Sequence, residues 1–281
     1  MVDCHMHMVL DGEYWKAAIA RHSCEIDTAW IRRVLEHYRQ AGFTYLRDCG
    51  DRWGVGKTAR VLAPEYGITY RTPLASFYHK GHYGGIIGKP FETFGEFAAL
   101  VRKNREDGAD FIKIMISGLM DFDHYCVLTE AGLPPAEIKE LIHIAHSEGL
   151  AVSVHGNGTE NVRAAAEAGV DSVEHGAYLN EEALWAMKEA GTVWVPTLST
   201  IGNLRGKGRF SEPDVIKILA SALENVARFS KMGGLVAPGT DAGAWQVPHG
   251  SKTEYTLLQE ALGDSYADLL SRGIQRIQEK F

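Results

Sequence analysis

The sequence predicts an α/β protein in which 281 residues form a single (β/α)8 TIM barrel. Short β-branched or aliphatic runs alternate eight times with longer amphipathic patterns, as expected where each strand is followed by a helix. No long linker, low-complexity stretch or block of like charges interrupts the series, so residues 1–281 are expected to form one domain. A barrel uses about 250 residues, which leaves a short helical tail at about 263–281. A doubly wound open sheet has the same alternation and is the main alternative.

Eight strands are expected from the apolar runs. The clearest helix follows the fourth of them and is opened by Pro134 and Pro135, because the missing N–H of a proline costs nothing in a first helical turn. Apolar residues then recur at i, i+3, i+4 and i+7 from Ile138, and Gly149 ends the pattern. The expected strands lie at residues 2–4, 43–46, 68–70, 111–114, 151–154, 170–173, 193–195 and 235–237.

Composition and charge exclude several classes of partner. The chain has 29 Lys and Arg against 36 Asp and Glu, a net charge of −7, and no basic cluster. Nucleic acids and anionic membrane surfaces are both recognised by clustered cations, so neither is an expected partner. No run of 18 apolar residues occurs, and the N-terminus lacks the pattern of a signal peptide. The four cysteines form no CxxC pair, and we expect free, buried thiols in a reducing cytoplasm.

Residue types that bind metal ions follow four of the expected strands. His5 and His7 form a His-x-His pair at the first strand, and both side chains point the same way because strand residues alternate faces. His155 follows the fifth strand, His175 the sixth and Asp241 the eighth. Imidazoles and a carboxylate suit zinc or a similar divalent ion. Because the C-terminal ends of barrel strands face one mouth, these side chains are expected to form one metal site.

Lys113 interrupts the apolar strand of residues 111–116. A lysine inside a barrel is costly unless it is neutralised or paired. One interpretation is an ion pair with an interior carboxylate. The other is specific to a site beside metal ligands: a neutral lysine can add carbon dioxide and become a carbamate, an anionic group that can bridge two cations.

Five segments, taken in order, resemble the amidohydrolase superfamily. The strand around Lys113 with Ser117 and Gly118, and the run SVEHGAYL at residues 172–179, are similar to the prolidase-like branch of imidazolonepropionase relatives. The resemblance extends from residue 2 to about residue 260. The five segments are VDCHMH (2–7), FIKI (111–114), VH (154–155), EHG (174–176) and GTDAG (239–243).

The resemblance implies a binuclear metal centre. One divalent ion would lie between the His-x-His pair and Asp241, and the other between His155 and His175. A carbamate on Lys113, formed from carbon dioxide, and a hydroxide would bridge them. The ions are expected to be zinc, with manganese as the alternative. Asp241 would also be the catalytic proton shuttle, first as a general base and then as a general acid.

The function implied is hydrolysis of an amide C–N bond in a small peptide-like or N-acyl substrate, as in a dipeptidase. A lactonase, a phosphotriesterase or a cyclic-amide hydrolase is the alternative, because water activated by the same metal centre can attack any of these electrophilic groups. A catalytically silent barrel that only binds a ligand is the alternative from another class. A small molecule is the expected partner in each case.

Two side chains on loops after strands are expected to contact the substrate. By the resemblance, His82 would donate a hydrogen bond to the substrate carbonyl, and Tyr178 would contact a substrate carboxylate. The alternative is a surface histidine and a tyrosine at the rim.

Relatives in this family usually carry a small β-sandwich, and this chain begins at the first expected strand. We therefore expect the β-sandwich to be absent and the metal centre to be intact. The barrel edges would then be covered by the helical tail or by a partner subunit, and the second option implies a homo-oligomer.

Overall fold

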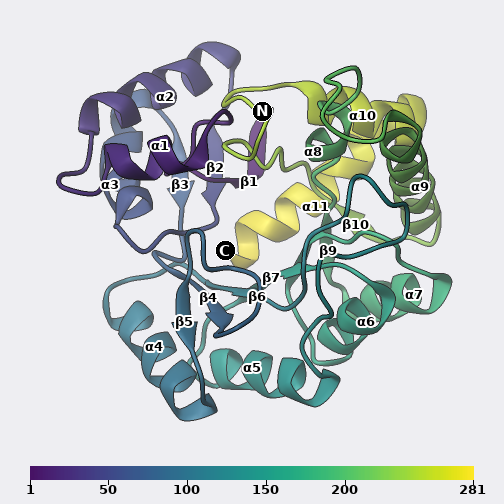
Figure 1. The fold of residues 1–281 in the computed structure, drawn as a ribbon, viewed down its shortest axis with the longest axis horizontal. Helices are drawn as coiled ribbons and strands as arrows, with labels where there is room; N and C mark the ends of the chain where they lie inside the picture. Colours follow the sequence, from purple (N-terminus) through teal and green to yellow (C-terminus); the bar gives the residue numbers. More distant parts are fainter.

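The computed structural model describes residues 1–281 and places parallel strands inside a surrounding layer of helices (Figure 1). Each of the eight expected runs overlaps an observed strand. The strands are β1 (Val2–Met6), β2 (Tyr45–Asp48), β3 (Thr69–Arg71), β4 (Ser76–His79), β5 (Lys89–Phe91), β6 (Ile112–Met115), β7 (Val152–Gly156), β8 (Ser172–His175), β9 (Val193–Val195) and β10 (Leu235–Val236).

The sequence missed β4 and β5. Both are short, and β5 contains Pro90 at the outer edge of its sheet, where a strand can tolerate a residue without a backbone donor. His82, which we expected on a loop after a strand, follows β4.

Helices follow most of the strands, and α5 has the pattern expected of it. It begins at Pro135, and its buried residues include Ile138 and Leu141 at the predicted spacing. The helices are α1 (Trp15–Arg21), α2 (Thr28–Ala41), α3 (Val55–Leu62), η1 (Ala63–Tyr66), α4 (Phe94–Glu106), α5 (Pro135–Ser147), α6 (Thr159–Glu167), α7 (Glu181–Ala190), α8 (Ser199–Gly202), α9 (Glu212–Lys231), α10 (Thr253–Leu262), η2 (Gly263–Ser265) and α11 (Tyr266–Lys280). None of them combines the length and the apolar character needed to cross a membrane.

The strands form two parallel sheets, which confirms the α/β class. Their orders are β1-β2-β3 and β10-β9-β8-β7-β6-β4-β5. Backbone hydrogen bonds join β1 to the segment after β10. The N–H of Cys4 donates to Pro238 O at 2.9 Å, and the N–H of Asp241 donates to His5 O at 2.7 Å. These bonds place the ends of β1 and of the segment after β10 side by side.

The C-terminal helix α11 packs against the first residues of several strands. Its Ile277 and Phe281 share an apolar cluster with residues such as Val2 and Phe111. Gly273 is required here, since a Cβ at this position would lie only 2.1 Å from Val236 O. Helix α11 therefore covers the end of the sheets that is opposite to the C-terminal strand ends, and in Figure 1 it lies across the centre of the molecule.

Candidate metal centre

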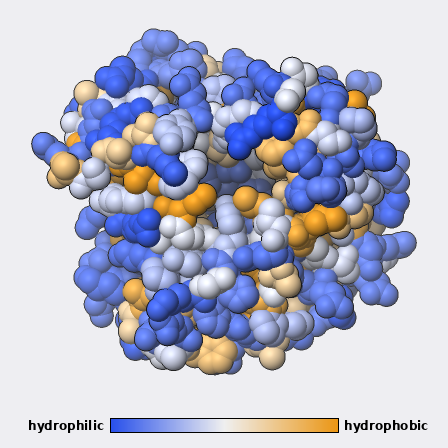
Figure 2. Space-filling view, viewed as in Figure 1, coloured by the Kyte–Doolittle hydropathy of each residue, from blue (hydrophilic) through white to orange (hydrophobic).

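The C-terminal strand ends surround a cavity of about 400 Å³. The hollow is visible at the centre of the face in Figure 2. All six residues that we expected to bind metal ions line it: His5, His7, Lys113, His155, His175 and Asp241.

The His-x-His pair and Asp241 lie in direct contact. Nε2 of His7 is 3.0 Å from Oδ1 of Asp241, and Nε2 of His5 is 3.3 Å from the same oxygen. Burial alone would raise the pKa of Asp241, but the adjacent His5 and His7 hold it well below its usual range. The carboxylate therefore stays ionised, which is the form that binds a cation.

The other two histidines lie next to this trio. The ring centroids of His155 and His175 are 4.4 Å apart, and that of His175 is 4.9 Å from that of His5. Burial, reinforced by Lys113, lowers the pKa of His155 to about 3. Burial and the neighbouring His155 lower the pKa of His175 well below its usual value. Both imidazoles are neutral at physiological pH, as metal ligands must be.

His175 and Asp241 both have left-handed backbone conformations, with φ of 70° and 58°. A non-glycine residue pays a steric penalty there, and such residues cluster at functional sites. Each of them turns the chain at a strand end and directs its side chain to the cavity that they both line.

Lys113 belongs to β6 and is only 2% exposed. Its Nζ atom has no hydrogen-bond partner, and no interior carboxylate forms an ion pair with it. The expected alternative of an interior ion pair is therefore wrong. Because a buried ammonium without a partner is costly, the position favours a chemical change at Nζ or a ligand that pairs with it.

Glu174 is a candidate functional residue that sequence reasoning did not single out. It lies fully buried on β8, where Oε2 accepts a hydrogen bond from Nδ1 of His5 at 2.7 Å. Its other oxygen accepts from Arg47 at 2.8 Å. A carboxylate on one ring nitrogen fixes the tautomer and leaves the other nitrogen free for a metal. The signal was the glutamate before His175, an ionisable residue inside an apolar strand.

Comparisons with known proteins agree with this geometry. No protein-family model matches the chain. An ochratoxinase from Aspergillus niger is 28% identical over 277 residues, which covers 85% of this chain and 56% of that protein. The chain thus spans about half the length of this relative. A crystal structure of a Xaa-Pro dipeptidase with bound methionine has a TM-score of 0.79 at 23% identity, covering 100% of this chain and 75% of the other. The crystal structure of A. niger ochratoxinase also has a TM-score of 0.79 at 23% identity, covering 98% of this chain and 70% of the other. The chain therefore has the same fold as the Xaa-Pro dipeptidase and ochratoxinase structures.

The structure places the two expected substrate contacts outside the lining of the main cavity. His82 is half-buried, with Nδ1 3.7 Å from Oε1 of Glu130. The ring of Tyr178 packs edge-on against that of Tyr125, at 5.7 Å between centroids, and lines a small separate pocket. The hydroxyl of Tyr178 is buried without a partner. Substrate contact by either residue stays a prediction.

The outer wall of the cavity is mostly apolar and aromatic, with one cation, Arg209, and one carboxylate, Glu13. The guanidinium of Arg209 lies 4.3 Å from the ring centroid of Trp245 and 5.2 Å from that of Phe210. It forms no ion pair with a carboxylate of the chain. Figure 2 shows hydrophobic residues around the hollow. Further apolar residues of the wall are Trp15, Ile86, Leu119, Met120 and Phe122.

The expectation about the cysteines has a mixed outcome. The four cysteines are free, but only Cys4 and Cys49 are buried, whereas Cys24 and Cys126 are exposed. The expectation of buried thiols was therefore wrong for the latter two, which lie on loops outside the apolar core.

Proposed function

We propose that this chain is a metal-dependent hydrolase that cleaves an amide C–N bond of a small peptide-like or N-acyl substrate. The observation that carries the proposal is the convergence of four imidazoles, one carboxylate and one lysine on the floor of a single cavity. Similarity to an ochratoxinase and to a Xaa-Pro dipeptidase supports amide hydrolysis over hydrolysis of a lactone or a phosphotriester.

The donor set fits divalent cations. Three polar atoms around the cavity are buried and have no hydrogen-bond partner: Nδ1 of His7, Nζ of Lys113 and Oδ1 of Asp241. Buried polar groups without partners are rare in native proteins, and a bound cation would satisfy the carboxylate oxygen and the neutral imidazoles. A carbamate on Lys113 would convert the lysine into a further anionic ligand. Zinc and manganese both accept these nitrogen and oxygen ligands.

Divalent ions bound here would lower the pKa of a water molecule and polarise the scissile carbonyl. The protein supplies positioning and proton transfer. His5, held by Glu174, keeps its Nε2 directed at the cavity. Asp241 accepts the proton of the attacking water and passes it to the departing amine nitrogen, a shuttle that contributes about 10²- to 10⁴-fold to such reactions.

The wall of the cavity supports a substrate with a large apolar group and a carboxylate. Trp245 and Phe210 offer aromatic surface, and Arg209 beside them is an exposed cation that forms no ion pair within the chain. Guanidinium groups pair well with carboxylates because their fork matches the two oxygens. An N-acyl amino acid with a bulky acyl group, or a dipeptide with an aromatic side chain, has both features.

We also infer that the two sheets belong to one closed (β/α)8 barrel formed by a single domain. The hydrogen bonds between β1 and the segment after β10 support closure on one side. On the other side, the N–H of Asp110, just before β6, donates to Thr72 O, just after β3, at 3.0 Å.

A substrate screen tests the proposed function. The protein is loaded with zinc or manganese and assayed against dipeptides, N-acyl amino acids, lactones and phosphotriesters, with a chelated sample as the control. We expect amide hydrolysis that is lost on chelation and restored by metal. A protein that takes up no divalent metal on titration, or that hydrolyses only lactones or phosphotriesters, would contradict the proposal.

A further inference from the structure

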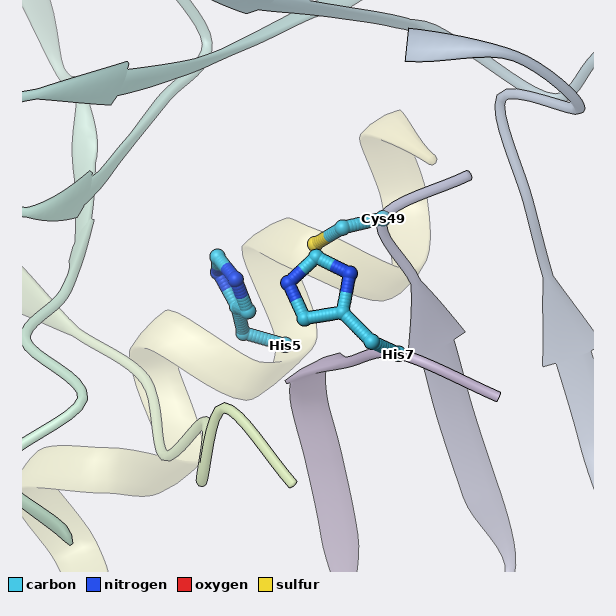
Figure 3. Close-up of side chains that lie close together, drawn as sticks. All are labelled: His5, His7 and Cys49. Carbon is cyan, nitrogen blue, oxygen red and sulfur yellow. The ribbon is translucent and has the colours of Figure 1, made fainter. Parts of the chain in front are cut away.

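Cys49 lies beside the His-x-His pair. The two imidazoles and the thiol face one another across a small space in Figure 3. The Sγ atom and one ring nitrogen each of His5 and His7 all lie within 4.8 Å of one another. Cys49 is 1% exposed. The resemblance that suggested the other ligands gives this residue no role.

The backbone holds Cys49 in this place. Cys49 directly follows β2, and its N–H donates to Met6 O at 2.9 Å, between the two histidines of the neighbouring strand. The sulfur forms no disulfide and no hydrogen bond to another side chain. The thiol is thus a preorganised donor that no other contact of the chain uses.

We propose that Cys49 is a ligand of the metal ion that His5 and His7 hold. The inference rests on the proposed metal-dependent function and deepens it. On binding, the S–H bond breaks, its proton passes to solvent, and a metal–thiolate bond forms. A thiolate is a soft ligand, so a site with two imidazoles and one thiolate favours zinc over manganese. The cysteine therefore determines which metal this chain selects.

Spectroscopy of the wild-type protein tests the assignment without an activity assay. The protein loaded with Co²⁺ should have a near-ultraviolet thiolate-to-cobalt absorption band. X-ray absorption of the zinc form should show a Zn–S distance of about 2.3 Å beside Zn–N distances of about 2.0–2.1 Å. Zinc that is bound by nitrogen and oxygen alone would overturn the role of Cys49 and leave the proposed function standing. A protein that binds no metal would overturn both.

Variants then show which cysteine supplies the sulfur ligand. Cys49→Ala should lose the band and the Zn–S signal, and its Kd for zinc in a chelator competition should rise by at least about tenfold, because even changes outside the ligand set cost about 10- to 100-fold. The affinity for manganese should change less. Cys4→Ala is the matched control: Cys4 is also buried and precedes His5, but it packs in the apolar cluster at α11. A band that persists in Cys49→Ala and disappears in Cys4→Ala would refute the assignment. The wild-type spectra decide the question even if one of the variants fails to fold.

Discussion

Nδ1 of His5 donates a hydrogen bond to Oε2 of Glu174 over 2.7 Å, and both side chains are buried. The same glutamate pairs with the buried guanidinium of Arg47 through its other oxygen. Although burial alone would raise the pKa of Glu174, Arg47, Lys113 and the hydrogen bond from His5 hold it well below its usual range. One carboxylate thus orients a proposed metal ligand and neutralises an interior cation.

Replacing Glu174 should weaken the metal centre. In Glu174→Gln the amide can present an N–H to Nδ1 of His5, which disfavours the tautomer that directs Nε2 to the cavity. We expect zinc affinity to fall by about 10- to 100-fold, and the free energy of unfolding of the metal-free protein to fall by up to about 3–5 kcal/mol because Arg47 loses its counter-charge. Chelator competition and urea unfolding measure the two effects.

Ser153→Ala is the control, since Ser153 donates only to the oxygen that faces Arg47. Unchanged zinc affinity in Glu174→Gln would contradict the orienting role.

Lys113 should make metal uptake depend on carbon dioxide. We expect the metal-free protein to regain activity with zinc more completely when bicarbonate is added than in buffer freed of carbon dioxide. Lys113→Ala should be nearly inactive and insensitive to bicarbonate, because it has no amine to carbamylate. The measurement is kcat/KM after reconstitution under both conditions. Full activity of the alanine variant, or equal recovery of the wild type in both buffers, would exclude the carbamate.

Arg209 should select substrates that carry a carboxylate. Because the guanidinium is exposed, its contribution is modest, and Arg209→Ala should raise KM for a carboxylate substrate by about two- to tenfold while kcat changes little. The matching substrate with an amidated carboxyl group should show no such change. Lys207→Ala is the control, a cation on the same loop that does not line the cavity. If KM rises equally for both substrates in Arg209→Ala, Arg209 acts through packing on Trp245 and not through charge.

Glu254 should make the stability of the fold depend on pH. It is fully buried, Oε2 accepts hydrogen bonds from N and Oγ of Ser199, and Oε1 has no partner. Burial raises the pKa of Glu254 from 4.5 to about 8. The folded state therefore retains a proton that the unfolded state has lost, so this residue makes stability fall as the pH rises from about 4.5 to about 8.

Glu254→Gln should remove that contribution, since the amide resembles the protonated acid. We expect similar unfolding free energies for the two proteins near pH 4.5 and a more stable variant near pH 8. Urea unfolding of the metal-free proteins across this range measures the difference. Parallel curves for wild type and variant would show that Glu254 has the same pKa in both states.

The sequence predicted the parallel strands and the positions of the proposed ligands because both depend on local pattern. Apolar runs mark buried strands, and a polar residue at the end of such a run must face a strand-end cavity. His5, His155 and Asp241 were predicted as ligands in this way. The distances between their side chains could not be predicted. Strands β4 and β5 were missed because neither has a long enough apolar run to signal burial.

The sequence by itself thus determined the α/β class and the set of side chains that meet at one strand end. The tertiary structure alone decided how that set is supported and what lies beside it. Cys49 and Glu174 became functional candidates only when the fold placed β2 beside β1 and brought Glu174 of β8 within hydrogen-bond distance of His5. The physical reason is that hydrogen-bond partners and metal ligands are defined by distance in space, and residues 5, 49 and 174 are adjacent only after the sheets form.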